Sequence, residues 1–350
     1  MIGKKIFALL LAAIALDNTA SAAASAGKDT KFVQAGKYAL DGVDRWDYLG
    51  VDPIRHHLFI SRGSHVQVLD IDTGKQIADM PDTDGVHGFA FAEERKLGFI
   101  TNGHAGTITA FDLDTLKAVA TIGAGGHDPD AIAYSPVLSR VFVSNGESDS
   151  VSAIDTTARK VIATMDIGGK PESLAVDNTG MVFVAVEDKN EIVAMNGRSN
   201  TVIEHWPLAG CDEPSGLAID AASRRLFAVC SNKRMVVVDA DNGRMIAALP
   251  IGAKPDAAAF DPVLNLAFSS NGGNGTLTVV HEDDPNHFHV TQNVATQAGA
   301  RTLALDTGSH RIFLVSAKLG KRPAPTRLTP HPRPPVQDGT FVVLLVQPAL

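Results

Sequence analysis

The chain has 350 residues and a formal net charge of −8 at neutral pH. Binding to nucleic acid rewards a basic surface, because lysine and arginine release the counterions of the phosphates, so the charge counts against a nucleic-acid partner. Aromatic residues make up only 6%, whereas the 31 glycines suit many short strands joined by tight turns.

The first 22 residues have the pattern of a secretory signal peptide. Two lysines lie within residues 1–5, residues 6–16 are entirely apolar, and Ala20-Ser21-Ala22 has the small residues that a signal peptidase recognises. The apolar run is too short for a stable membrane anchor, and no later segment approaches its length. We therefore expect a periplasmic protein without a membrane span, in which residues 23–350 form a single domain.

One pattern recurs seven times in the rest of the chain. Each copy begins with a small and apolar segment, most often after a proline, as in residues 129–134. The residue after the usual proline position is, in chain order, Asp47, His87, Asp130, Glu172, Ser215, Asp256 and Arg301. Successive copies are therefore 40, 43, 42, 43, 41 and 45 residues apart, which is the period of a four-stranded propeller blade.

Each copy predicts the same four strands. The first strand is followed by a second such as 141–145, a third that ends in aspartate such as 66–70, and a fourth such as 161–165. Alternating or β-branched runs between Gly, Asn and Asp turns are typical of antiparallel hairpins. We therefore predict an all-β fold, a seven-bladed β-propeller.

The two ends of the chain predict how the ring closes. The seventh copy has strands at 302–306, 312–315 and 340–347 and lacks a fourth. An additional strand, residues 32–40, precedes the first copy. We expect this N-terminal strand to complete the last blade, because pairing would cover an exposed sheet edge.

The second strands resemble those of a known family. Residues 141–145 (Val-Phe-Val-Ser-Asn) and 98–102 (Gly-Phe-Ile-Thr-Asn) are similar to the signature strand of the YVTN-repeat, or YncE-like, bacterial propellers. The resemblance covers nearly all of residues 23–350 and implies the fold, but it implies little about function, because such scaffolds host unrelated activities. Single-stranded DNA binding has been proposed for a relative; the acidic charge and scarce aromatic residues count against it here.

The residues that begin the innermost strands are expected to surround one mouth of the central channel, here called the upper mouth. In an antiparallel blade the second strands end on the same face, so their last residues should form an outer tier. The candidate ligand-binding residues from both tiers are Asp47, His87, Asp130, Glu172, Asp256, Arg301, Asn102, Asn145 and Asn271. Because Arg301 is expected to offset only one carboxylate, the ring predicts a site for a polar ligand or a cation.

Several occupants of the upper mouth remain open: a small-molecule ligand, a metal ion, a periplasmic partner protein, or only water. A divalent metal is the candidate cofactor, because carboxylates suit Ca²⁺ or Mg²⁺ and a histidine admits a transition metal. Its candidate ligands are Asp47, His87, Asp130, Glu172 and Asp256. We expect a monomer.

The alternative function is that of a lactonase-like hydrolase at the same mouth. His87, Glu172 and Arg301 are the candidate catalytic residues, which would polarise an ester carbonyl and activate water. The sequence contains no G-x-S-x-G nucleophile elbow. This alternative rests on architecture alone.

Two features lie outside the repeat pattern. Cys211 and Cys230 are expected near the upper face of blade five, as either a disulfide or two thiols. Residues 318–337 form a Pro-rich, basic insertion in blade seven that favours an extended conformation. The insertion is a lid over the mouth, an arm that docks a partner, or a solvated loop.

Other polar residues are assigned no function at this level. Asp128 lies just outside the ring and is interpreted as a solvated loop residue. His281, His287 and His289 show no recognised metal spacing. The aspartates that end third strands, such as Asp70, are expected to accept hydrogen bonds from turn amides.

Overall fold

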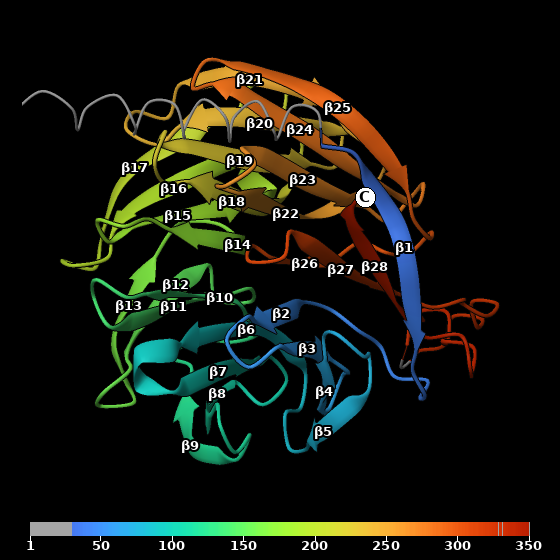
Figure 1. Ribbon diagram of the computed structural model, residues 1–350. Coiled ribbons are helices and arrows are strands. Elements are labelled where there is room, and N and C mark those ends of the chain that lie inside the picture. Colours follow the sequence, from blue (N-terminus) through green and yellow to red (C-terminus); the bar gives the residue numbers. More distant parts are fainter. Residues whose placement is uncertain (1–29, 328, 331, 350) are drawn as a thin grey trace, which may run out of the picture.

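Seven antiparallel sheets of four strands surround a central channel, as a computed structural model of the chain shows (Figure 1). The structure describes residues 30–327, 329–330 and 332–349, and the predicted signal peptide, residues 1–22, lies outside them. The predicted all-β, seven-bladed propeller is confirmed. The helices among the described residues are two short 3₁₀ turns, η1 (Glu93–Arg95) and η2 (Glu187–Lys189), and neither is long enough to cross a membrane.

The strands of each blade follow one another outward from the channel. Blades one to three comprise β2 (Leu49–Asp52), β3 (His57–Ser61), β4 (Val66–Asp70) and β5 (Gln76–Met80); β6 (Val86–Ala92), β7 (Leu97–Asn102), β8 (Thr107–Asp112) and β9 (Ala118–Gly123); and β10 (Pro129–Ser135), β11 (Arg140–Asn145), β12 (Ser150–Asp155) and β13 (Lys160–Asp166). Blades four and five comprise β14 (Pro171–Val176), β15 (Met181–Val186), β16 (Glu191–Asn196) and β17 (Thr201–Pro207); and β18 (Pro214–Asp220), β19 (Arg225–Cys230), β20 (Arg234–Asp239) and β21 (Met245–Pro250). Blade six comprises β22 (Pro255–Asp261), β23 (Leu266–Asn271), β24 (Thr276–Asp284) and β25 (His287–Ala295), and blade seven β26 (Leu303–Asp306), β27 (Arg311–Ser316), β28 (Val342–Pro348) and β1 (Phe32–Ala39).

The second strand of every blade has both faces buried, because each blade packs between two others. The third residue of each second strand is a fully buried phenylalanine: Phe59, Phe99, Phe142, Phe183, Phe227, Phe268 and Phe313. Outer strands such as β13 alternate exposed and buried residues instead. The continuous apolar runs of the sequence are therefore strands buried on two sides.

The N-terminal strand closes the last blade, as predicted. β1 pairs antiparallel with β28, from Phe32 opposite Pro348 to Ala39 opposite Val342. Phe32 is fully buried and packs edge-on against Phe268 of blade six, with ring centroids 5.3 Å apart. Its backbone N–H and carbonyl both bond to the side chain of Gln292 in β25. One strand thus joins two blades.

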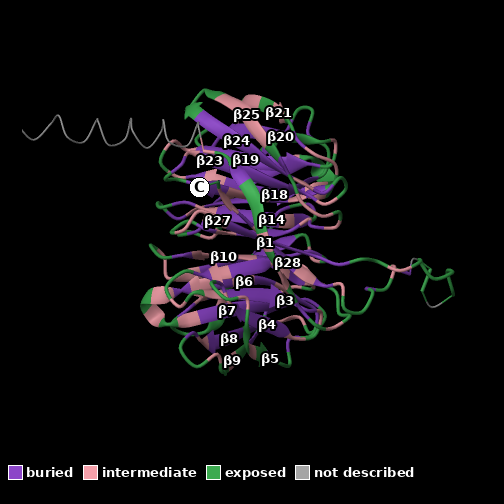
Figure 2. Cartoon of the chain, turned by 45° about the vertical axis from the view of Figure 1, so that its right-hand side comes forward, coloured by how far each residue is buried: buried purple, intermediate pink, exposed green. Residues whose placement is uncertain are grey.

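The two unusual features of the sequence now have a structure. Cys211 and Cys230 form a disulfide at the entry to β18. The Pro-rich insertion extends away from the blades (Figure 2) and starts and ends at a bridge between Leu319 and Val336. Arg45 donates a hydrogen bond to the carbonyl of Pro334 at the base of the insertion.

Candidate functional site

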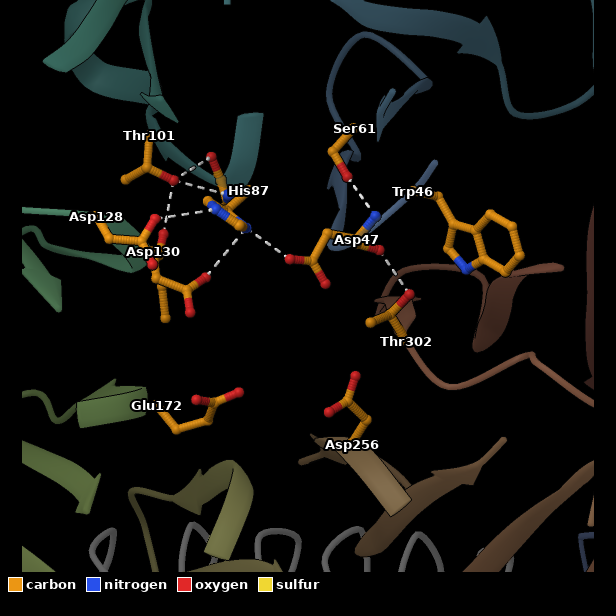
Figure 3. A network of polar contacts seen from close by, with 12 residues as sticks. Trp46, Asp47, Ser61, His87, Thr101, Asp128, Asp130, Glu172, Asp256 and Thr302 are labelled. Carbon is orange, nitrogen blue, oxygen red and sulfur yellow. Dashed lines mark hydrogen bonds and ion pairs between the residues drawn. The ribbon is translucent and has the colours of Figure 1, made fainter. Parts of the chain in front are cut away.

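The side chains near the start of the innermost strands point toward the upper mouth, as Asp47, His87, Asp130, Glu172 and Asp256 do (Figure 3). In blades two to six the pairing between the first and second strands is interrupted at this point, as between Pro129 and Ile132 in blade three. A β-bulge of this kind redirects a side chain away from the regular alternation. In blades two to six, the local irregularity therefore presents the ring residue to the channel.

Hydroxyl groups of neighbouring blades hold the backbone of the ring. Thr101 of blade two donates to the carbonyl of Asp130 in blade three, at 2.6 Å. Ser144 donates in the same way to the carbonyl of Glu172, at 3.1 Å, and Thr302 to that of Asp47, at 2.6 Å. Five of the seven ring residues are thus held by a hydroxyl group of the blade before them.

His87 lies among three carboxylates. Its Nδ1 is 2.6 Å from Asp47 Oδ2 and 3.5 Å from Asp130 Oδ1, and its Nε2 is 3.5 Å from Asp128 Oδ1. Burial alone would lower the pKa of His87, but the hydrogen bonds to Asp128 and Asp47 and the charge of Asp130 raise this pKa to about 10. The side chain of His87 is therefore an imidazolium at neutral pH.

Arg301 contacts two carboxylates rather than the one expected from the sequence. Its guanidinium donates to Asp256 and to Asp47 Oδ1, the latter at 2.8 Å. Burial raises the pKa of Asp47, but the bonds to His87 and Arg301 outweigh burial and leave this pKa below its usual range. Asp256, Arg301, Asp47 and His87 thus form a continuous charge-paired chain along one side of the mouth.

The opposite side of the ring is poorly compensated. Burial, reinforced by the charge of Asp47, holds the pKa of Asp130 well above its usual range, and Asp130 Oδ1 has no hydrogen-bond partner among the described residues. Burial also raises the pKa of Glu172 to about 7. Its nearest cation, Lys170, lies 3.5 Å from Glu172 Oε2 and bonds more closely to Glu187.

Below the ring the channel contains a cavity of about 130 Å³. Every blade contributes to its wall, with Tyr48, Gly88, Ala131, Ser173, Gly216, Asp256 and Leu303 as one residue from each. A side chain at Gly216 would meet the backbone of Ala257 and Ala258 at 2.6–2.7 Å, so the blades approach closely there. At about 30 Å³ for each water molecule, the cavity holds an ion or a few waters.

The predicted outer tier does not join this ring. Asn102, Asn145 and Asn271 are buried, and each donates to two hydroxyl groups of the following strand, as Asn145 does to Ser150 and Ser152 at 3.1 and 3.0 Å. They brace the hairpin between second and third strands. The sequence analysis placed them at the mouth because it located the strand ends but not the direction of the side chains.

Asp128 and Lys170 are site residues that the sequence analysis missed. Both stand two positions before a ring residue. The corresponding residues of other blades, Gly85, Glu213, Lys254 and Gly299, adopt a positive φ, as Asp128 does. Extending the comparison of the seven copies upstream by two residues would have identified this turn, which directs Asp128 to His87.

Fold and mouth together define a seven-bladed β-propeller with a carboxylate-rich opening. No protein-family model matches the sequence, nor does any curated protein. Among solved structures, the WD40 repeats of RRP9 are similar with a TM-score of 0.73 and 9% identity, over 91% of this chain and 100% of that one. Hydrazine synthase of Kuenenia stuttgartiensis has a TM-score of 0.66 and 15% identity, over 81% of this chain and 95% of that one. At such identities the likeness supports the fold.

Proposed function

We propose that this protein is an exported propeller that binds a divalent transition-metal ion at its upper mouth. Asp47, His87 and Asp130 supply the ligands. Each offers one ligand atom, and these atoms all lie within 4.8 Å of one another. One imidazole and two carboxylates suit Mn²⁺, Fe²⁺ or Zn²⁺.

The observation that carries the proposal is the state of Asp130. Its carboxylate lies within the protein, and the Oδ1 atom makes no hydrogen bond among the described residues. A buried carboxylate oxygen without a hydrogen bond is costly, because the ion pair with His87 Nδ1 at 3.5 Å repays its desolvation only in part. A cation between Asp130 and Asp47 would supply the missing interaction.

The charge of the mouth favours the same kind of occupant. Six carboxyl groups, those of Asp47, Asp128, Asp130, Glu172, Glu187 and Asp256, face the cations of His87, Lys170 and Arg301. This excess of negative charge repels anions and concentrates cations at the opening. The small volume of the cavity below excludes a bulky ligand from the channel itself.

Metal binding at this site should release a proton. His87 coordinates only as a neutral ring, and its pKa of about 10 means that the ring is protonated beforehand. Calorimetric titration of Mn²⁺ or Zn²⁺ into chelator-treated protein, in two buffers of different ionisation enthalpy, measures that proton together with the Kd. We expect Asp130→Asn to raise the Kd about 5- to 150-fold, equivalent to about 1–3 kcal/mol.

Glu213→Gln is the matched control. It removes one negative charge from the corresponding loop of blade five, where the side chain is exposed, so binding should change little. If Asp130→Asn and Glu213→Gln weaken metal binding equally, the effect comes from the overall charge of the protein, and the proposed site is wrong. A titration without proton release would remove His87 from the ligand set.

One observation favours the hydrolase alternative. Glu172 has a pKa of about 7, which suits a general acid or base at neutral pH. His87 does not fit the role of base, because it is protonated up to about pH 10. Lactone hydrolysis that persists in the presence of a chelator and is lost in Glu172→Gln would favour the enzyme over the binding protein.

Export is supported by two features of different kind. The N-terminal sequence has the signal-peptide pattern, and the Cys211–Cys230 disulfide is of the kind that persists in oxidising compartments. Fractionation of cells that express the full chain tests the periplasmic location. Retention of a full-length, reduced protein in the cytoplasm would contradict it.

A further inference from the structure

The outer hairpin of blade six departs from the repeat pattern. In the first three blades and in the fifth, the third strand ends in an aspartate that accepts turn hydrogen bonds, as Asp70 Oδ1 does from Thr73 at 2.8 Å. The corresponding position in blade six, opposite the first residue of the second strand, is His281. β24 continues beyond this position, and β24 and β25 have nine residues each, more than the other described strands. The usual turn cap is absent here, and a histidine occupies its place.

The extension brings a second histidine and a carboxylate to His281. His281 and His289 are directly paired across β24 and β25, so both side chains stand on one face of the hairpin. Their ring centroids are 5.6 Å apart. The pairing is irregular between Glu282 and Asp284, and at this β-bulge the carboxylate of Asp283 lies next to both imidazole rings.

The Asp283 carboxylate lies between the two imidazoles. Its Oδ1 is 3.2 Å from Nδ1 of His281, and its Oδ2 is 2.6 Å from Nδ1 of His289. The three ligand atoms lie within 4.8 Å of one another. The sequence analysis regarded these histidines as too scattered for a metal, because the cross-strand pairing that joins them is not visible in linear spacing.

We infer that His281, Asp283 and His289 form a second metal site, for Zn²⁺ or Cu²⁺, in the outer hairpin of blade six. Two imidazoles and one carboxylate are the ligands these ions prefer, whereas Ca²⁺ and Mg²⁺ prefer sets made of oxygen alone. The site is built on a rigid strand pair rather than a loop. It is independent of the site proposed at the mouth.

Burial gives this site a closed side and an open side. The side chain of His281 is 2% exposed, while those of Asp283 and His289 are 30% and 40% exposed. A metal can therefore enter from solvent, and water can complete a tetrahedral shell at about 2.0–2.2 Å from the ion. Three protein ligands with one solvent position are also the pattern of exchangeable rather than purely structural zinc.

The test is a titration of Zn²⁺ and Cu²⁺ into chelator-treated protein that carries Asp130→Asn, in which binding at the mouth is weakened. We expect one ion per chain, and for Cu²⁺ an electron paramagnetic resonance spectrum with coupling to two nitrogens. His289→Asn should weaken binding at least about tenfold, since even outer-shell changes cost about 10–100-fold. The partly exposed position of His289 should leave the melting temperature unchanged, which circular dichroism verifies.

His287→Asn is the matched control. His287 lies on the same strand and forms the same kind of pair, from its Nδ1 to Asp284 Oδ2 at 2.7 Å, but belongs outside the group of three. Binding should persist in this variant. Equal loss in His287→Asn and His289→Asn, or a protein with Asp130→Asn that binds neither ion, would overturn the second site. Loss of the mouth site alone would leave it standing.

Discussion

At the scale of single residues, the carboxylates of the mouth divide into a closely paired half and a half with weaker contacts to cations. Asp47 and Asp256 share Arg301, and Asp47 also holds His87. Asp130 and Glu172 have pKa values raised by burial. A carboxylate that completes a charge pair and one that is merely desolvated contribute to stability with opposite sign.

The two halves should therefore respond differently to neutralisation. In metal-free protein at pH 7, Asp47→Asn should lower the free energy of unfolding by about 1–3 kcal/mol, because His87 and Arg301 lose their shared partner but keep other carboxylates. Glu172→Gln should leave stability unchanged or raise it, because it removes a desolvated charge. Urea denaturation measures both. Equal destabilisation by the two variants would show that the ring is paired throughout.

The advantage of Glu172→Gln should depend on pH. The folded pKa of Glu172 is about 7 and its ordinary value 4.5; ionisation therefore costs the folded state stability as pH rises through this interval. The gain of the variant over the native protein should grow from about pH 4.5 to 7 and then level off. If the gain in stability of Glu172→Gln does not change with pH, it has a cause other than the ionisation of Glu172.

His87 should show the reverse dependence. Its folded pKa of about 10 lies above the ordinary value of 6.5. The stability that the imidazolium contributes is complete below about pH 6.5 and is lost as pH rises to about 10. His87→Gln, compared with the native protein by urea denaturation in the presence of a chelator, should thus be most destabilised at pH 6 and least at pH 10. If the difference in stability between His87→Gln and the native protein does not change with pH, the imidazole of His87 contributes packing alone.

Among the elements, β1 connects two blades, since it pairs with β28 of blade seven and contacts blade six. Phe32→Ala should cost about 3–5 kcal/mol, because a fully buried phenyl ring leaves a cavity against Phe268. Val33→Ala is the control, as its side chain is 43% exposed on the same strand, and it should cost little. Thermal unfolding distinguishes them. A Phe32→Ala protein as stable as the control would mean that β1 is a loosely held tail.

At the scale of the whole molecule, the sequence predicts the architecture more fully than the site. The seven copies of the repeat locate nearly every strand. The second strand of each blade is buried on two sides and is therefore continuously apolar, with residues such as Phe142 and Phe183. The ring residues follow from their place in the repeat. Side-chain direction does not, which is why Asn145 was assigned to the mouth and Asp128 was not.

Contacts between strands are the second limit on what the sequence can predict. The pair formed by His281 and His289 depends on the register of β24 and β25, and linear spacing carries no trace of it. The two partners of Arg301 likewise lie in other blades, Asp256 in blade six and Asp47 in blade one. Local sequence patterns predict the strands, whereas a site formed by two strands depends on the register in which they pair.

The pairing of β1 with β28 also dictates an order of events during biosynthesis. The strand that leaves the ribosome first has its partner, Val342–Pro348, at the far end of the polypeptide. Until that partner is present, β1 has no sheet edge to pair with, and the incomplete ring exposes two unpaired sheet edges to chaperones and proteases. Closure of so distant a contact carries the largest loop entropy in the chain. A chain that ends before residue 342 lacks the partner of β1 and therefore forms an open arc of blades with two unpaired sheet edges, rather than a closed ring.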